Sequence, residues 1–333
     1  MNTTHKFGMS PSFRHTMKVG GEDMLYIVLF ILFILLFIFG MTIIRFGLFN
    51  LSGNKLKGWL TKLTSTPLKG MVTGTFVTAL LQSSTAVMVI TIGLISAKIM
   101  TFPQSIGIIL GTNIGTTFKT ELITFNLDKI LVPLAIIGAL LTFFKPIKIR
   151  SIGMVTFGIA SVFTSMKGFE LLARPLTELP FINNFILSIN DNIILSILTG
   201  AVITAIIQSS TAMTGITMGF LTAGLLHLDA GIAIVFGANI GTCITAMIAS
   251  IGGGKESRLA AFAHVWLNVA GVLLFTPFIP ALSENAHLLA DEKMIQLAHI
   301  SVIFNIVSSI IVLPFATKFG EMILKVHGDK TTK

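Results

Sequence analysis

Apolar runs long enough to cross a lipid bilayer dominate this sequence. The run at 24–44 holds 21 residues and no charged side chain, and a helix that spans the hydrocarbon core needs about 20 such residues. Further apolar runs occupy residues 70–97, 103–123, 130–144, 151–166, 192–225, 229–250, 259–280 and 294–316. We therefore expect an all-α polytopic membrane protein whose first transmembrane helix ends near Arg45.

The composition excludes most soluble classes of protein. Of the 333 residues, 53% are apolar and 11% charged, whereas a soluble domain averages about 45–50% apolar and about 25% charged residues. These values exclude a soluble enzyme, a nucleic-acid-binding module and a disordered regulator. The net charge of +9 then indicates contact with anionic lipid headgroups. The single cysteine, Cys243, excludes a disulfide framework, and we interpret it as a packing residue.

A polar cluster interrupts two of the apolar runs. The sequence Gln-Ser-Ser-Thr occupies residues 82–85 in the first of these runs and residues 208–211 in the second. Backbone that breaks a helix at membrane depth persists only when it is buried in protein or lines a wet cavity. The runs at 70–97 and 192–225 are therefore predicted to form re-entrant hairpins, each of which turns at its polar tip and returns to the side it came from.

The two hairpins are copies of one unit. Residues 74–116 align with residues 200–242 without a gap, at a constant offset of 126 and with 19 identities. The identities include both polar clusters and the Asn-Ile-Gly-Thr segments that begin at Asn113 and Asn239. Matches at polar and glycine positions favour a shared function; a duplicated scaffold without a site is the alternative.

Loop charges predict how the hairpins are oriented. Basic residues dominate the segments 45–69, 145–150 and 251–258 and the C-terminal tail, and acidic residues dominate 281–293. Because basic loops face the cytoplasm, the first hairpin should enter from the cytoplasm and the second from outside, which makes the repeats inverted. This arrangement needs an N-terminus outside, which the basic residues before the first run oppose. Residues 54–63, with apolar side chains at helical spacing between lysines, are predicted to form a separate amphipathic helix in the membrane interface.

The predicted organisation follows from these runs and charges. It comprises an N-terminal extension (1–23), a first inverted repeat (24–150), a second inverted repeat (151–280), an outer loop with the last transmembrane helix (281–316) and a cytoplasmic tail (317–333). Inverted repeats with broken helices are typical of secondary transporters, and we expect an elevator-type transporter. A channel with hairpin filters is the nearest alternative, although such filters usually come from several identical subunits.

The hairpin tips have the chemistry of an oxyanion site. The returning half-helix of each hairpin offers free backbone N–H groups and the positive end of its dipole. No charged residue lies in either tip, so we expect the anion to bind together with a cation. The candidate anion ligands are the hydroxyl residues Ser83, Ser84, Thr85, Ser209, Ser210 and Thr211.

Oxygen ligands for a companion Na⁺ lie nearby. Each tip is followed by a Gly-x-Asn-Ile-Gly-Thr motif, whose glycines are expected to let the helix unwind and expose carbonyl oxygens. The candidate sodium ligands are Gln82, Gln208, Asn113, Asn239, Thr116 and Thr242. For the two asparagines, hydrogen bonding between helices is the alternative.

The paired motifs resemble the type II sodium/phosphate cotransporter family, which includes bacterial members. The resemblance covers residues 25–316 and rests on the doubled Gln-Ser-Ser and Gly-x-Asn-Ile-Gly-Thr motifs. It implies sodium-coupled symport of inorganic phosphate by a multi-pass protein of the plasma membrane, the inner membrane in bacteria. The central positions carried over by motif are Gln82, Ser83, Ser84, Gln208, Ser209 and Ser210.

The resemblance also sets expectations about partners. We expect phosphate, Na⁺ and membrane lipid as partners, no nucleic acid, no metal other than Na⁺, and no cofactor beyond that coupling ion; a homodimer stays open. Many bacterial members carry a PhoU-like domain after the membrane part. Since this chain ends about 17 residues beyond its last run, we expect that domain to be absent.

Two further groups of residues need an interpretation. His264 and Asn268 match the family's Ala-His-x-x-x-Asn pattern, but in the last run Ser301 stands where a second histidine is expected. We interpret the pair as a helix-packing hydrogen bond, with an accessory role in proton transfer or phosphate protonation as the alternative. Lys119 and Glu121 are expected to snorkel at the outer end of their helix.

An enzyme is not expected. An intramembrane serine hydrolase would need a base beside its serine, yet the serines are duplicated and His264 is not. A transporter for another small oxyanion, such as sulfate, arsenate or a dicarboxylate, is the stronger alternative. A dicarboxylate would usually require an arginine near the site, and neither tip contains one.

Overall fold

The computed structural model describes residues 20–62 and 64–328, and all regular elements within them are helical, as the sequence predicts. Most of the predicted N-terminal extension lies outside the described residues. The elements are α2 (Gly21–Lys62), α3 (Pro67–Leu81), α4 (Ser84–Ser96), α5 (Phe102–Leu122), η2 (Asp128–Ile130), α6 (Leu131–Thr142), α7 (Ile147–Thr177), α8 (Pro180–Asp191), α9 (Ile193–Ile207), α10 (Ser210–Thr222), α11 (Leu228–Ser250), α12 (Lys255–Phe275), η3 (Thr276–Phe278), α13 (Ile279–Glu284), η4 (Ala286–Leu288), α14 (Lys293–Val312), η5 (Leu313–Phe315) and α15 (Ala316–His327).

Several helices have the length and apolar character of membrane spans. In the described part of the chain, five segments qualify: Gly21–Ser52, Ile147–Thr177, Leu228–Ser250, Lys255–Glu284 and Lys293–His327. A sixth is added if α8 and α9, between which the chain bends by 120°, form one broken span. The other apolar runs fold into shorter or more polar helices; α6, for example, has 12 residues, or about 18 Å of helix.

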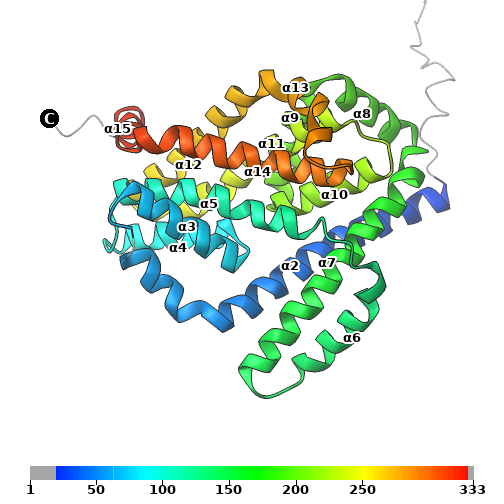
Figure 1. The fold of residues 1–333 in the computed structure, drawn as a ribbon, viewed down its shortest axis with the longest axis horizontal. Helices are drawn as coiled ribbons and strands as arrows, with labels where there is room; N and C mark the ends of the chain where they lie inside the picture. Colours follow the sequence, from blue (N-terminus) through cyan, green and yellow to red (C-terminus); the bar gives the residue numbers. More distant parts are fainter. Residues whose placement is uncertain (1–19, 63, 329–333) are drawn as a thin grey trace, which may run out of the picture.

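The N-terminal helix differs from the prediction. α2 continues without a break from Gly21 to Lys62, so neither the end near Arg45 nor a separate interfacial helix at 54–63 is observed. In Figure 1 the later part of α2 bends away from the line of its first part. Leu60 is fully buried, and the Trp59 ring lies 5.5 Å from that of Phe76 on α3. The end of α2 therefore packs against the first hairpin instead of lying in the interface.

Two other helices were not predicted. α8 is amphipathic, and its Asn190 side chain accepts a hydrogen bond from the His227 N–H (2.8 Å) and donates one to the Leu225 carbonyl (3.1 Å). It thereby holds the loop between α10 and α11. α15 occupies the predicted tail and docks on α12, because the His327 ring stacks on Phe262 at 4.0 Å and accepts a hydrogen bond from the Trp266 indole N–H (2.8 Å).

The helices form two groups around the hairpins. α2 packs along α7, and α6 packs along α7 as well, a group that lies at the lower side of Figure 1. The first hairpin (α3 and α4) packs with α5, and the second (α9 and α10) with α11. α14 runs beside α5, and α12 contacts both α5 and α11. The two motif-bearing helices, α5 and α11, thus each pack against a hairpin and against α12.

Glycines allow the entering half-helices to approach the motif helices closely. A Cβ atom on Gly74 would lie 2.7 Å from the Ile108 carbonyl oxygen, and a Cβ on Gly200 would overlap the Ile234 carbonyl oxygen. The two contacted residues, Ile108 and Ile234, are separated by the same offset of 126 positions as the two glycines. The internal repeat of the sequence is therefore also a repeat of helix contacts.

The close approach at Gly74 predicts a steric cost for a larger side chain. Gly74→Ala would force the added methyl group against backbone of α5, and we expect a loss of about 1–3 kcal/mol in the free energy of unfolding. Thermal unfolding of the purified protein in detergent measures this loss. Gly93→Ala is the matched control, because no atom lies within 4 Å of its added Cβ; a melting temperature lowered equally by both changes would contradict the packing argument.

Candidate functional site

Both polar clusters form the same capped break between two helices. α3 is followed by Gln82 and α9 by Gln208, and these two C-cap residues have left-handed conformations with φ of 51° and 52°. The hydroxyl of Ser83 accepts a hydrogen bond from the backbone N–H three residues further on (3.1 Å), and the hydroxyl of Ser209 does the same (3.2 Å). The predicted helix breaks are confirmed at both positions, and each returning helix begins with a serine cap.

The left-handed glutamines are unusual. Among the described non-glycine residues, only Gln82, Gln208 and Lys98 have a positive φ, a conformation that side chains with a Cβ rarely adopt. Two of the three thus lie at matched positions of the repeat. A conformation that is locally unfavourable and occurs twice must be held by the surrounding helices.

The two tips differ in exposure. Gln82, Ser83 and Ser84 are all buried, with at most 9% of their surface exposed. In the second tip Gln208 is exposed, and Ser209 is partly buried. The tips therefore have the same local backbone but unequal access to the surroundings.

Each hairpin also contacts the other repeat. α4, the returning half of the first hairpin, packs against α11, and α10 contacts α5. Each returning half-helix thus reaches the helix that carries the Gly-x-Asn-Ile-Gly-Thr motif of the other repeat. This crossed packing links the two predicted halves of the site through α5 and α11.

The motif helices do not unwind. α5 and α11 are helical through their Gly-x-Asn-Ile-Gly-Thr segments, so the predicted exposure of backbone carbonyls there is wrong. The glycines serve close packing instead: a Cβ on Gly115 would lie 2.6 Å from the Thr78 Cβ, and one on Gly241 would lie 2.7 Å from the Thr204 Cβ. Neither threonine hydroxyl, both buried, has a hydrogen-bond partner.

Asn113 bonds to a neighbouring helix, whereas Asn239 bonds to its own. The Asn113 side-chain amide donates to the Asn268 side-chain oxygen on α12 (3.1 Å), and Asn268 in turn donates to the His264 carbonyl (2.9 Å). Asn239 donates to the Val235 carbonyl (2.9 Å). The hydrogen bond between helices that the sequence offered as an alternative is therefore present in the first repeat.

Five of the six candidate sodium ligands use their side-chain hydrogen atoms and keep oxygen lone pairs. The Gln82 amide donates to the Ala79 carbonyl (2.5 Å). The hydroxyls of Thr116 and Thr242 donate to carbonyls four residues earlier (2.8 and 3.0 Å). Both asparagines likewise donate through their nitrogen atoms, as described above. Their side-chain oxygens are then available as acceptors, which is what a hard cation requires.

The capping serines show the opposite arrangement. The oxygen atoms of Ser83 and Ser209 already accept hydrogen bonds from backbone N–H groups, so their hydroxyl hydrogens are available to donate. Donors at the start of a helix suit an anion. The two capping serines thus differ in their hydrogen-bonding role from the candidate cation ligands described above.

α12 and α14 carry equivalent asparagines. The Asn268 and Asn305 amides each donate to the carbonyl four residues earlier, at 2.9 Å. The Asn305 side-chain oxygen and the His264 Nδ1 atom are buried without a hydrogen-bond partner. The predicted packing hydrogen bond is thus made by Asn268, while the His264 ring makes none through Nδ1.

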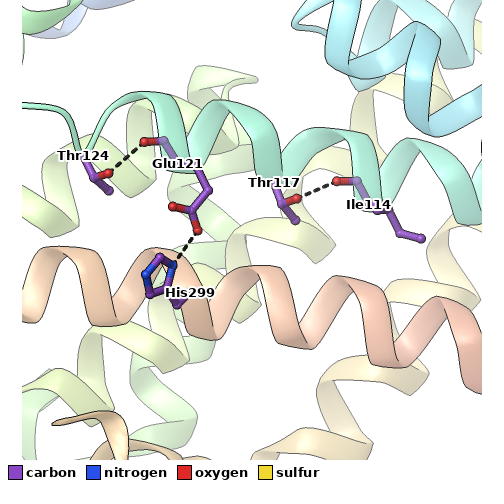
Figure 2. A network of polar contacts seen from close by, with 5 residues as sticks. All are labelled: Ile114, Thr117, Glu121, Thr124 and His299. Atoms are coloured by element: carbon purple, nitrogen blue, oxygen red, sulfur yellow. Dashed lines mark hydrogen bonds and ion pairs between the residues drawn. The ribbon is translucent and has the colours of Figure 1, made fainter. Parts of the chain in front are cut away.

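Lys119 and Glu121 point to different neighbours. Lys119 is only 7% exposed and lines a cavity together with Gln82, so its predicted snorkelling is wrong. Figure 2 shows Glu121 turned towards α14, where its carboxylate lies 2.9 Å from the His299 Nδ1 atom. The sequence did not predict this pair, because a contact between helices 178 positions apart leaves no local signal.

The sequence matches a known family over most of its length. The profile of the family described as Na⁺/Pi-cotransporter matches residues 36–170 and 180–311, and each stretch contains one hairpin. No solved structure matches the chain.

Three relatives illustrate the range of similarity. The uncharacterized protein YqeW of Bacillus subtilis (strain 168) is 38% identical over 300 residues, which are 90% of this chain and 98% of that protein. The putative inorganic phosphate export protein YjbB of Escherichia coli (strain K12) is 25% identical over 84% of this chain and 52% of its own length. The human sodium-dependent phosphate transport protein 2B is 32% identical over 148 residues, 42% of this chain and 21% of that protein. The chain thus spans about half the length of YjbB.

The fold and the two tips define a multi-pass helical membrane protein built around paired helix breaks. Within this class, the chain belongs to the Na⁺/Pi-cotransporter family. The predicted family resemblance is confirmed. Members of this family are transporters rather than enzymes.

The hydrogen bond between Asn113 and Asn268 predicts energetic coupling. In a double-mutant cycle of Asn113→Ala and Asn268→Ala, we expect a coupling of about 0.6 kcal/mol in the free energy of unfolding, the average for such bonds between membrane helices, and no more than about 1.7 kcal/mol. Denaturant titration of the reconstituted protein measures it. A cycle of Asn239→Ala with Asn268→Ala should be additive, because Asn239 bonds only within its own helix. Additivity in both cycles would show that the Asn113–Asn268 contact contributes nothing.

Proposed function

We propose that this protein is a secondary transporter that carries inorganic phosphate across the plasma membrane in symport with Na⁺. The observation that supports the proposal is the division of hydrogen-bonding roles between the capping serines and the candidate cation ligands. The capping serines have hydroxyl hydrogens to donate, whereas Gln82 and the asparagine and threonine residues of the motifs on α5 and α11 have oxygen atoms to accept. A site that needs both an anion and a cation to satisfy it is suited to cotransport.

Each ion has a set of proposed ligands. Phosphate binds at the starts of α4 and α10, where backbone N–H groups are free. Its proposed ligands are Ser83, Ser84, Thr85, Ser209, Ser210 and Thr211. Sodium binds at side-chain oxygens and at the carbonyl ends of the entering half-helices. Its proposed ligands are Gln82, Gln208, Asn113, Asn239, Thr116 and Thr242.

The membrane arrangement is part of the proposal. We place the two repeats in inverted orientations because their loop charges differ in the way the positive-inside rule requires. Coupling to an inward Na⁺ gradient then moves phosphate inward. The name of YjbB describes phosphate export, so the direction of flux is a separate outcome of the transport test.

Transport should depend on a sodium gradient. In proteoliposomes, we expect phosphate uptake that requires an inward Na⁺ gradient and that fails when Na⁺ is replaced by K⁺ or choline, because the anion site has no charged side chain in either tip. Uptake of radiolabelled phosphate measures this, with sulfate, arsenate and succinate as competitors. Equal uptake in Na⁺-free buffer would contradict the proposal, and strong competition by sulfate or succinate would indicate a different substrate.

The two tips should act as one site. Ser84→Ala and Ser210→Ala each remove a hydroxyl beside the proposed anion, and a lost hydrogen bond to a charged group costs about 1.5–3 kcal/mol. We expect each change to raise the apparent phosphate constant by about tenfold to a hundredfold. The double variant should deviate from additivity by about 0.5–3 kcal/mol, because the two hydroxyls would share one ligand. Phosphate titrations at matched expression measure these effects; an unaffected single variant would contradict a shared site.

A further inference from the structure

A cavity of about 350 Å³ lies beside the first hairpin tip, between α2, α3, α5 and α7. Its wall is almost wholly apolar, with Met41, Ile44, Ile159 and Val162 among the lining residues. Two polar side chains line it as well. One is Gln82, the left-handed glutamine of the tip, and the other is Lys119.

Lys119 has no partner for its charge in the described part of the chain. Its side chain is 93% buried, since only 7% of the residue is exposed. The two ion pairs found among the described residues join Lys167 to Glu170 and His299 to Glu121. The carboxylate nearest in sequence, Glu121, faces α14 instead (Figure 2). The Lys119 side chain thus lies next to a cavity with no carboxylate paired to it among the described residues.

A second cation lies close to it. Arg45 on α2 follows Ile44, which lines the cavity, and its Nε atom is buried without a hydrogen-bond partner. Arg45 is near enough to Lys119 for the two positive charges to interact unfavourably. Arg45 as a whole is only partly buried, whereas Lys119 is buried, and a buried cation is costly unless an anion lies beside it.

Lys119 has no counterpart in the second repeat. If the offset of 126 is continued along the motif helices, the position that matches Lys119 on α11 is Thr245. The repeat therefore supplies two similar tips, while the positive charge is beside one of them. A feature that breaks the internal repeat is not needed for the shared helix packing, so it requires an explanation of its own.

We propose that Lys119 and Arg45 form a phosphate-group site beside Gln82, adjoining the first hairpin tip. The proposal rests on the proposed function for its choice of anion and adds a fixed positive charge to a site whose tips have none. Both side chains carry hydrogen-bond donors that a phosphate group could accept, and an arginine fork matches the oxygens of such a group. The ligand is inorganic phosphate on its way to the tip or, because the walls are apolar, the phosphate headgroup of a membrane lipid.

Equilibrium binding distinguishes these sources. Binding of radiolabelled inorganic phosphate is measured for the wild type, Lys119→Gln and Lys119→Arg in detergent, and retention of phosphatidylglycerol is measured by native mass spectrometry. Lys69→Gln is the control, because Lys69 is exposed on α3 and the change removes the same charge. We expect Lys119→Gln to weaken phosphate binding by about tenfold to a hundredfold, and Lys119→Arg to restore most of it.

Each outcome bears on the proposal. If phosphate binding is unchanged but Lys119→Gln loses bound phosphatidylglycerol, the site takes the lipid headgroup. If neither ligand responds more than in Lys69→Gln, the proposal is overturned. A wild type that transports no phosphate would contradict the proposed function. The ratio of phosphate binding by the variant to phosphate binding by the wild type tests this site alone.

A second measurement uses the unmodified protein, so its result does not depend on whether a variant folds. An amine-reactive reagent labels Lys119 and Lys69, and mass spectrometry reports the extent at each position. We expect phosphate or phosphatidylglycerol to slow labelling of Lys119 several-fold, with no effect of chloride and no effect at Lys69. Lys119 labelling that neither phosphate nor phosphatidylglycerol slows would overturn the proposal.

Discussion

A helix that breaks inside a membrane leaves backbone groups that no water can satisfy, and the arrangement around both tips answers this constraint. The serine caps at Ser83 and Ser209 satisfy one N–H group each, so the others need protein around them. That protein is supplied by α5 and α11, which approach the entering half-helices at Gly74 and Gly200 more closely than any larger residue allows. The breaks that supply donors for a ligand therefore occur where the entering half-helices pack closely on the motif helices.

The sequence predicted the helix breaks and the repeat because both depend on residues that are costly in an apolar run. Four consecutive polar side chains inside such a run have few tolerable environments, and their recurrence at one offset removes chance as an explanation. The bounds of α2 could not be predicted in the same way. Arg45 was interpreted as the end of a span, since a charge usually marks the interface, whereas the structure buries its Nε atom within a continuous helix. Burial by α7 and the neighbouring helices is a tertiary effect that the local pattern does not carry.

Lys119 and Glu121 show the same limit within the site. Both lie near the end of an apolar run, which indicates their depth but not the direction in which each side chain points. Residues two apart on a helix lie on different faces, and here one faces a cavity while the other meets His299. The glycines of the Gly-x-Asn-Ile-Gly-Thr motif were likewise interpreted as a source of flexibility. Their role is close approach to Thr78 and Thr204, which only the neighbouring helices reveal.

The two tips have one sequence and one backbone conformation but different surroundings. Since the φ angles of Gln82 and Gln208 agree within a degree, the burial of Gln82 and the exposure of Gln208 cannot come from the motif. They must come from the helices packed around each tip. A mechanism that moves those helices as bodies would keep the capped breaks intact, whereas remaking a break would expose unsatisfied backbone groups. The cavity beside Lys119 lies between α2 and α7 on one side and the first hairpin with α5 on the other, so relative motion of these groups would change how close the positive charge is to the tip.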